Sequence, residues 1–449
     1  MGQHAPEVTA PRLFLGVARS LTGQVWRDRL DDAARAQALA MVQEWALPDL
    51  VARILAGRGV MAHEAQIFLD PKMRDLMPDP LSMRDMDRAV ARLVQAVKAN
   101  ETVGVFGDYD VDGACSTALL VEGLSALGLA CRFHIPDRLT EGYGPNTEAL
   151  QGLVAQGARL LVTVDCGVTS HEVITAVAGA GTDILVLDHH QAPEILPPAQ
   201  AVVDPNRLDD LSGLGHLCAA GVVFLTLVAL YRALRQDGFF TATRQEPDLR
   251  QGLDLVALAT VADVVPLLGL NRAFVRQGLQ IMRQRQRTGL RALIDAVRLN
   301  GPVEAWHLGY LLGPRINAGG RIGDAALGVR LLLSGDAEEA ERIALQLDAL
   351  NRDRQVIEAG MVDEGEAAAL RQVGVHEDLG AVIVTAGQSW HPGVVGLVAA
   401  RLKERFARPA FALALDEQGL ATGSGRSIAG VDLGRVVRKA VEDLSLIHI

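Results

Sequence analysis

The chain has 449 residues, of which 49% are hydrophobic and 22% are charged. This length and hydrophobic content predict two or three folded domains and exclude an intrinsically disordered protein. Lysine and arginine number 43 against 54 acidic residues, so the net charge is −11. That balance excludes a histone-like, polybasic nucleic-acid binder, although it leaves room for a local basic channel.

The cysteines and the apolar segments bear on the compartment. Cys115, Cys131, Cys166 and Cys218 form no C-x-x-C pair, so neither a disulfide framework nor a zinc site is expected. The N-terminus lacks a basic segment followed by a sustained apolar core, which argues against a signal peptide. The longest apolar stretch, Leu217–Tyr231, is shorter than the roughly 20 residues that a bilayer requires. We therefore expect a soluble cytoplasmic protein.

The first 335 residues predict a helical lead-in followed by an α/β domain. Residues 1–95 carry no evident chemistry, whereas residues 96–335 begin with strands that alternate with helices. The predicted strands are 102–106, 131–135, 160–164, 184–187 and 201–203, and the helices between them are 114–127, 147–156 and 170–178. This alternation is typical of β-α-β units and a parallel sheet covered on both faces. The rest of this region is mainly helical, with predicted helices at 218–234, 252–262, 271–286 and 289–297.

The last third of the chain predicts a linking helix and a second, smaller domain. Residues 336–375 have few glycines or prolines and many charged helix formers, which predicts one or two long helices. In residues 376–449 an α/β pattern restarts, with predicted strands at 381–385 and 410–415, helices at 394–406 and 432–444, and a Gly/Ser loop at 422–426.

The first predicted strand ends in GDYDVDG, which places Asp108, Asp110 and Asp112 in one short segment. Open α/β sheets bind ligands at the carboxyl ends of their strands. Three carboxylates this close repel one another unless a cation neutralises them, so a metal site is favoured over a polar turn that caps the next helix. A calcium loop is excluded because its twelfth position, which requires Glu, is Leu119.

Further candidate ligands follow three later elements. Asp165 ends a buried strand, where an acid is often only the next helix's N-cap. Asp188, His189 and His190 follow another strand, and carboxylate with imidazole suits manganese, iron or zinc better than calcium or magnesium alone. Asp263 follows an apolar helix, where an acid opposes the helix dipole.

Together these side chains could hold two divalent ions that share a carboxylate. Two ions about 3.5–4 Å apart can activate water and clamp a phosphoryl group. The H-E-x-x-H spacing of metallopeptidases is absent from the sequence.

The ordered motifs GDYDVDG, VDCG, LDHH, VVDPNR and TVADVVPL resemble those of the DHH phosphoesterase family. The later motifs GPRINAGGRIGDA, SWHPGVVGLVAARL and GSGRS are similar to those of the family's single-stranded-DNA-specific exonucleases, and the resemblance extends over roughly residues 50–444. It implies an α/β fold: a parallel-sheet DHH domain with a helical extension, a long linking helix and a smaller α/β DHH-associated domain.

The resemblance also implies roles for individual residues. Asp165 would bridge two metal ions, His190 would approach the scissile phosphate, and Asp188 would orient an imidazole, unless Asp188 is only a turn residue. The implied metal ligands are Asp108, Asp110, Asp112, Asp165, His189 and Asp263.

Phosphate-binding residues are implied in both domains. They are cations, amides and hydroxyls near flexible glycines: Arg315, Asn317, Arg321, His391, Ser424, Arg426 and Ser427. The alternative for GPRINAGGR is a surface loop with two arginines. Base stacking is not a strong expectation because aromatic residues make up only 4% of the chain, and Tyr143 is a weak candidate for it.

The activity implied is 5′→3′ exonuclease cleavage of single-stranded DNA in repair and recombination, releasing 5′-mononucleotides with two divalent ions, Mn²⁺ preferred or Mg²⁺. Single-strand-binding protein and a helicase are candidate partners, no membrane is involved, and a monomer is expected. The alternative is a family phosphodiesterase for short oligoribonucleotides or cyclic dinucleotides. A family II pyrophosphatase is less favoured because its first motif is different. A replication scaffold that has lost its metal ligands is also disfavoured, because every acidic motif position of this sequence holds an acid.

One departure concerns the C-terminus. The family's exonucleases continue into a Gly-Gly-His segment and an OB-fold, and neither is found after the predicted helix 432–444. The final residues SLIHI, 445–449, follow this helix directly. We interpret this as a truncated or misjoined end, with weakened DNA binding expected and activity uncertain.

Overall fold

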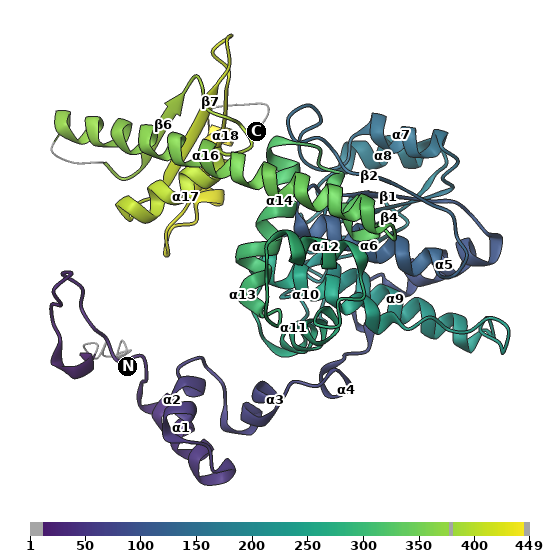
Figure 1. Cartoon of the computed structure of the whole chain (residues 1–449), viewed down its shortest axis with the longest axis horizontal. Helices are drawn as coiled ribbons and strands as arrows, with labels where there is room; N and C mark the ends of the chain where they lie inside the picture. Colours follow the sequence, from purple (N-terminus) through teal and green to yellow (C-terminus); the bar gives the residue numbers. More distant parts are fainter. Residues whose placement is uncertain (1–11, 377–379, 444–449) are drawn as a thin grey trace, which may run out of the picture. The chain divides into compact units, whose positions relative to one another are not determined.

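A computed structural model describes residues 12–376 and 380–443 (Figure 1). The chain divides into two compact units: Met1–Met77 with Leu268–Ala273, and Pro78–Leu267 with Phe274–Ile449. Residues 445–449, interpreted above as a truncated or misjoined end, lie outside the described residues.

The first unit is built from short helices. They are α1 (Asp32–Trp45), α2 (Asp49–Ala56), α3 (Ala65–Leu69) and α4 (Met73–Leu76). Helix α1 begins where the side chain of Asp31 accepts a hydrogen bond from the amide of Ala34, at 2.8 Å, which satisfies a donor at the helix start. Met41 and Leu55 lie in the small apolar core of this unit.

The boundary of the lead-in differs from the one expected at residue 95. Helix α5 (Met86–Ala99) belongs to the second compact unit, where it packs against α9 (Ala219–Gln236) and β5 (Ala201–Val203). The reason is its apolar face, on which Val90, Leu93 and Val97 are buried.

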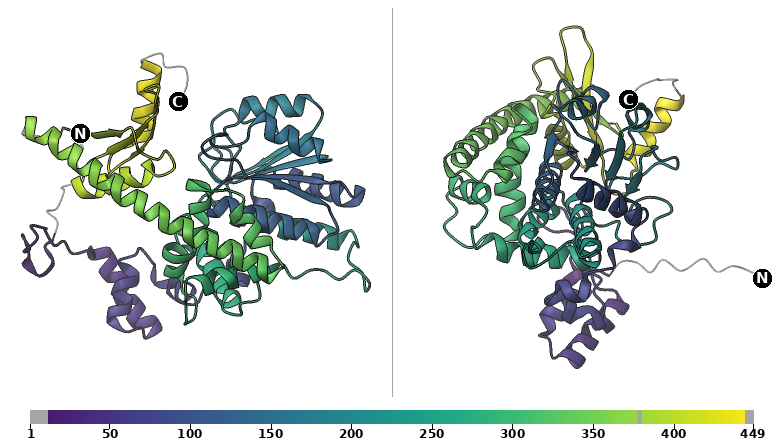
Figure 2. Two further views of the ribbon diagram at one scale, coloured as in Figure 1. Left: turned by 45° about the horizontal axis from the view of Figure 1, so that its top comes forward. Right: turned by 90° about the vertical axis from the view of Figure 1, so that its right-hand side faces the viewer.

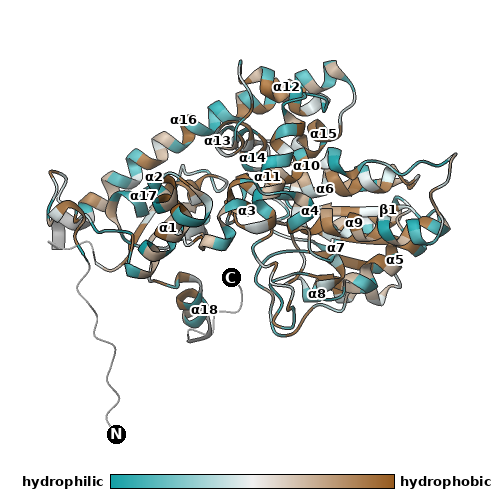
Figure 3. Cartoon of the chain, turned by 90° about the horizontal axis from the view of Figure 1, so that it is seen from below, coloured by the Kyte–Doolittle hydropathy of each residue, from teal (hydrophilic) through white to brown (hydrophobic). Residues whose placement is uncertain are grey.

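The predicted parallel sheet is confirmed, with strand order β2-β1-β3-β4-β5. Its strands are β1 (Val103–Gly107), β2 (Cys131–His134), β3 (Leu160–Val164), β4 (Asp183–Leu187) and β5 (Ala201–Val203). Helices α5, α6 (Val111–Ser125) and α9 cover one face, and α7 (Thr147–Ala155) and α8 (His171–Gly179) cover the other (Figures 1 and 2). The strands are coloured mainly as apolar in Figure 3, as expected for a sheet buried on both faces.

Helix α9 is longer than the apolar stretch expected from the sequence. By length and mean hydropathy, 18 residues at 1.3, it could cross a bilayer, so the expectation that its apolar stretch is too short was wrong. However, 72% of it is buried inside the protein, as in the core helix of a soluble fold.

A helical extension follows the sheet. Its helices are α10 (Leu253–Ala262), α11 (Gly269–Met282), α12 (Thr288–Ala296), α13 (Ala305–His307), α14 (Gly313–Ile322) and α15 (Leu327–Leu333). The pair Gly319–Gly320, expected to be flexible, is buried inside α14. There these glycines permit close helix packing instead of loop motion.

The chain then forms one long helix and a second sheet. Helix α16 (Ala337–His376) has 40 residues and leads to β6 (Ile383–Gly387), α17 (Val395–Phe406), β7 (Ala410–Leu415), β8 (Ala421–Arg426) and α18 (Leu433–Asp443). Strands β6 and β7 are parallel, and β7 and β8 are antiparallel. The segment predicted as a Gly/Ser loop is therefore strand β8. Gly423 is required there because a Cβ at this position would lie 2.8 Å from the carbonyl oxygen of Ala412.

Candidate metal centre

The loop after β1 presents three aspartates at the carboxyl end of the sheet. The side chain of Asp110 accepts a hydrogen bond from the amide of Gly113 at 3.0 Å, so it caps α6 while remaining available as a ligand. Asp112 is buried and accepts hydrogen bonds from the amides of Ala219 and Ala220, at 2.6 and 2.8 Å, at the start of α9. Oδ1 of buried Asp108 has no hydrogen-bond partner among the described residues.

Asp165 follows β3 and lies at the centre of the site. Its φ of 61° is in the left-handed region, which is uncommon outside glycine and is found at functional sites where the surroundings impose it. Its amide donates to the carbonyl of Leu187 at 3.0 Å, so the turn is tied to the end of β4. The side chain is buried, and it faces the neighbouring acids.

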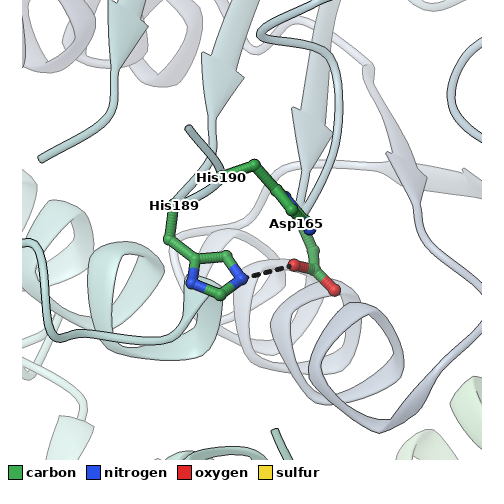
Figure 4. A group of neighbouring side chains, drawn as sticks. All are labelled: Asp165, His189 and His190. Atoms are coloured by element: carbon green, nitrogen blue, oxygen red, sulfur yellow. Dashed lines mark ion pairs between the residues drawn. The ribbon is translucent and has the colours of Figure 1, made fainter. Parts of the chain in front are cut away.

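His189 directs its Nε2 atom at three carboxylates. Its Nδ1 atom lies 3.1 Å from the carbonyl oxygen of Leu217, which fixes the ring and identifies Nδ1 as the donor. Nε2 then lies 3.2 Å from Oδ1 of Asp165 (Figure 4), 3.7 Å from Oδ2 of Asp112 and 3.8 Å from Oδ2 of Asp263. The free nitrogen is therefore positioned as a metal ligand.

His190 is held by a different partner. Oδ1 of Asp188 lies 2.8 Å from its Nδ1, and this hydrogen bond raises the pKa of His190 to about 9. Burial would raise the pKa of Asp188, but the bond from His190 and backbone amides holds it below its usual range. The hydroxyl of Tyr143 lies 3.3 Å from Nε2 of His190, so this tyrosine contacts the predicted catalytic imidazole.

The six predicted metal ligands form two groups, and a third group contains His190. In each group, one potential ligand atom per residue lies within 4.8 Å of the others: Asp108, Asp110 and Asp165; Asp112, His189 and Asp263; Asp165, His189 and His190. Asp165 contacts His189 and belongs to the first and third groups, as a bridging carboxylate would.

The buried acids of this centre are suited to hold cations. Burial and the neighbouring Asp110 raise the pKa of Asp108 to about 8, and burial and Asp112 raise the pKa of Asp263 to about 7. The pKa values of Asp112 and Asp165 are raised as well, mainly by burial. Buried carboxylates with an unpartnered oxygen fit divalent ions with oxygen and imidazole ligands. The assignment of each ligand stays a prediction.

A cluster of cations adjoins the acids. The pKa values of Arg321, His391 and Arg426 are all lowered, first by burial and then by the nearby guanidinium group of Arg138. Among the described residues, Arg138, Arg321 and Arg426 form no ion pair. Arg138 lies over the ring of Tyr109, the residue between Asp108 and Asp110, and its charge lowers the pKa of Asp108, so this arginine lies beside the candidate metal centre.

Arg138 was missed by the sequence analysis. It belongs to no recognised motif and lies in an irregular segment after β2. Its place near the site is evident only in the structure, where its guanidinium carbon lies 5.2 Å from the ring centroid of Tyr109. Ser424 joins the cluster through a hydrogen bond from Arg426 at 2.7 Å. Both adjoin Gly396 at the start of α17, where helix amides favour anions.

Three predicted phosphate-binding residues have other contacts. Arg315 forms an ion pair with Asp348 at 2.9 Å, and Oδ1 of Asn317 accepts from the amide of Val111 at 3.1 Å. The hydroxyl of Ser427 donates to the carbonyl of Val431 at 2.6 Å. The structure does not bring these side chains into the cation cluster, and their role in phosphate binding remains a prediction.

Two segments of the chain match family models. Residues 102–260 match the N-terminal domain of the DHH family, and residues 379–445 match the DHHA1 domain. The single-stranded-DNA-specific exonuclease RecJ of Dickeya dadantii is 40% identical over 406 residues, covering 90% of this chain and 69% of that protein. The chain belongs to the RecJ family.

Other members agree with this assignment. RecJ of Bacillus subtilis is 37% identical over 88% of this chain, which spans 48% of that longer protein. A crystal structure of exonuclease RecJ bound to manganese matches with a TM-score of 0.68 and 36% identity, covering 82% of this chain and 87% of the other. RecJ of Thermus thermophilus with Mn²⁺ gives a TM-score of 0.73 and 34% identity, covering 91% and 56% respectively.

Proposed function

We propose that the chain is a single-stranded-DNA-specific 5′→3′ exonuclease that requires two divalent metal ions. One observation carries this proposal: six candidate ligands from four separate elements converge, in groups linked by Asp165 and His189. The RecJ relatives are single-stranded-DNA-specific exonucleases, and crystal structures of RecJ contain manganese or magnesium. Mn²⁺ is therefore the expected ion, with Mg²⁺ as the alternative.

The proposed reaction is hydrolysis of a phosphodiester bond. When bound, two divalent ions would activate water and neutralise the charge that develops on the phosphate. In-line attack on phosphorus would expel the 3′-oxygen of the terminal nucleotide and release a 5′-mononucleotide. Because its pKa is about 9, His190 is an imidazolium at neutral pH, which suits it to stabilise that charge or to protonate the leaving oxygen. Asp188 would hold the ring in place.

The cation cluster supports a DNA substrate. The guanidinium groups of Arg138, Arg321 and Arg426, which form no ion pair with any described residue, match the oxygens of a phosphate, and they adjoin the carboxylates that would hold the metals. Such a cluster also resolves the conflict between a net charge of −11 and a polyanionic substrate, because the local charge decides binding.

Hydrolysis of 5′-labelled substrates tests the proposal. With Mn²⁺, single-stranded DNA is expected to be degraded to mononucleotides, whereas blunt duplex DNA is spared and EDTA abolishes the reaction. Faster hydrolysis of dinucleotides or cyclic dinucleotides than of single-stranded DNA would instead assign the alternative phosphodiesterase activity. Single-strand-binding protein and a helicase as partners, a monomeric state and a cytoplasmic location belong to the same proposal.

A further inference from the structure

We infer that α14 positions the metal-ligand loop after β1, and that Asn317 and Gly320 are its positioning residues. The inference rests on the proposed metal centre and adds residues that are not ligands. It starts from one hydrogen bond: Oδ1 of Asn317 accepts from the amide of Val111 at 3.1 Å. Val111 lies between the candidate ligands Asp110 and Asp112 and is the first residue of α6.

This bond satisfies a donor that α6 cannot satisfy by itself. The first amides of an α-helix have no partner within the helix. The side chain of Asp110 takes the amide of Gly113 and leaves that of Val111 for a partner from elsewhere. Asn317, 206 positions away in the sequence, supplies it. The first turn of α6, which carries Asp112, is thereby tied to α14.

Gly320 contacts the same loop one turn further along α14. A Cβ at this position would lie 2.5 Å from the carbonyl oxygen of Tyr109 and 3.1 Å from its Cβ. Only glycine permits so close an approach. Tyr109 separates Asp108 from Asp110, so α14 contacts both residues that lie between the three aspartates. Positions three apart share a helix face, and one face of α14 therefore sets the loop's backbone.

Helix α14 is held in place by contacts with α16 and with the segment that precedes α17. Arg315 forms an ion pair with Asp348 of α16 at 2.9 Å and donates to the carbonyl of Leu311 at 2.7 Å. Arg321 donates to the carbonyl of Gly393 at 3.1 Å, in the segment that precedes α17. A helix held at both sites can fix the spacing of the aspartates before metal binds, and such supporting contacts typically change metal affinity about 10- to 100-fold.

Gly320→Ala separates positioning from ordinary stability. Because a Cβ at Gly320 would meet the carbonyl oxygen of Tyr109, a merely structural role predicts a lower melting temperature with unchanged Mn²⁺ binding by the folded protein. Positioning predicts an Mn²⁺ dissociation constant raised at least about tenfold, measured on the whole chain by titration calorimetry and Mn²⁺ electron paramagnetic resonance. Gly360→Ala in α16 is the matched control, because a Cβ there meets nothing within 4 Å.

Asn317 supplies the second test. Asn317→Ala should weaken Mn²⁺ binding by a similar factor and raise the Mn²⁺ concentration that gives half-maximal rate, while kcat at saturating Mn²⁺ is retained. Asn317→Asp keeps the acceptor oxygen and should restore binding. Ile316→Val is the control, because Ile316 faces Gly328 rather than the loop. Mn²⁺ affinity within twofold of the unmodified protein for both Gly320→Ala and Asn317→Ala would overturn the inference. This result is independent of whether single-stranded DNA is the substrate.

Discussion

Oδ1 of Asp188 lies 2.8 Å from Nδ1 of His190, and this pair distinguishes two adjacent histidines. His189 donates instead to a backbone carbonyl, which leaves its Nε2 free to face the carboxylates. The same tripeptide therefore presents one imidazole whose Nε2 faces carboxylates and a second whose Nδ1 is paired with a carboxylate. The difference arises from the partner of each Nδ1 atom rather than from the sequence of the histidines themselves.

Replacing Asp188 with asparagine tests the role of this pair. The asparagine side chain keeps an oxygen that can accept from the amide of Val168, but it lacks the negative charge that raises the pKa of His190 to about 9. We expect this pKa to fall toward its ordinary value, so the imidazolium is lost as the pH rises through neutrality. The alkaline limb of the kcat/KM profile should move to lower pH, with roughly tenfold less activity at pH 8. Glu194→Gln, an exposed change in the following loop, is the control, and an unmoved limb would contradict the assignment.

Asp165 is the residue whose loss should be most severe. Asparagine tolerates the left-handed backbone at φ 61°, so Asp165→Asn removes the carboxylate without the conformational cost of alanine. We expect hydrolysis of single-stranded DNA to fall at least about 10³-fold and fewer Mn²⁺ ions to bind per chain. Asp165→Ala should be equally inactive. A near-normal rate in either variant, with circular dichroism unchanged, would show that Asp165 bridges no metals.

The sequence predicted the sheet and the acidic centre because both depend on short-range patterns. Each strand is a compact apolar run, and each acid follows the end of an element, so parallel connections bring them together. Arg138 could not be predicted in this way, since its position depends on how the segment after β2 folds over Tyr109.

The glycine-rich elements were predicted incorrectly for a related reason. Strand β8 and helix α14 contain glycines that usually favour loops, and only tertiary packing selects the extended or helical state. Gly423 admits Leu413, and Gly320 admits Tyr109. Local propensity does not predict which distant residue packs against a glycine that has no side chain.

Arg138 provides a prediction for the DNA-binding surface. Arg138→Ala should weaken the binding of single-stranded DNA and reduce the slope of log affinity against log salt by about 1, because one phosphate contact is lost. Arg132→Ala is the matched control, because this exposed arginine on β2 forms, among the described residues, only a hydrogen bond to the carbonyl oxygen of its neighbour Cys131. Fluorescence anisotropy with a labelled oligonucleotide measures both values. Equal salt slopes for the two variants would remove Arg138 from the proposed surface.

The buried acids predict how stability depends on pH and metal. Asp108 and Asp263, with pKa values of about 8 and 7, keep their protons in the folded protein, whereas the unfolded chain loses them near pH 4. The folded state therefore binds more protons, and without metal its stability falls as the pH rises from about 5 to 8, by up to about 1.4 kcal/mol per pH unit for each group. Metal ligation requires the ionised carboxylates, so Mn²⁺ should stabilise most at high pH.

Thermal melts at pH 5.5 and pH 8, with EDTA or with Mn²⁺, measure this dependence. The gain in melting temperature from Mn²⁺ should be larger at pH 8, where less work is needed to remove the protons that compete with the ions. Asp263→Asn removes one of these acids, so it should raise the metal-free melting temperature at pH 8 and reduce the gain from Mn²⁺. Equal gains at both pH values would mean that the buried acids are not the groups that bind the metal, because protons and Mn²⁺ would then not compete for them.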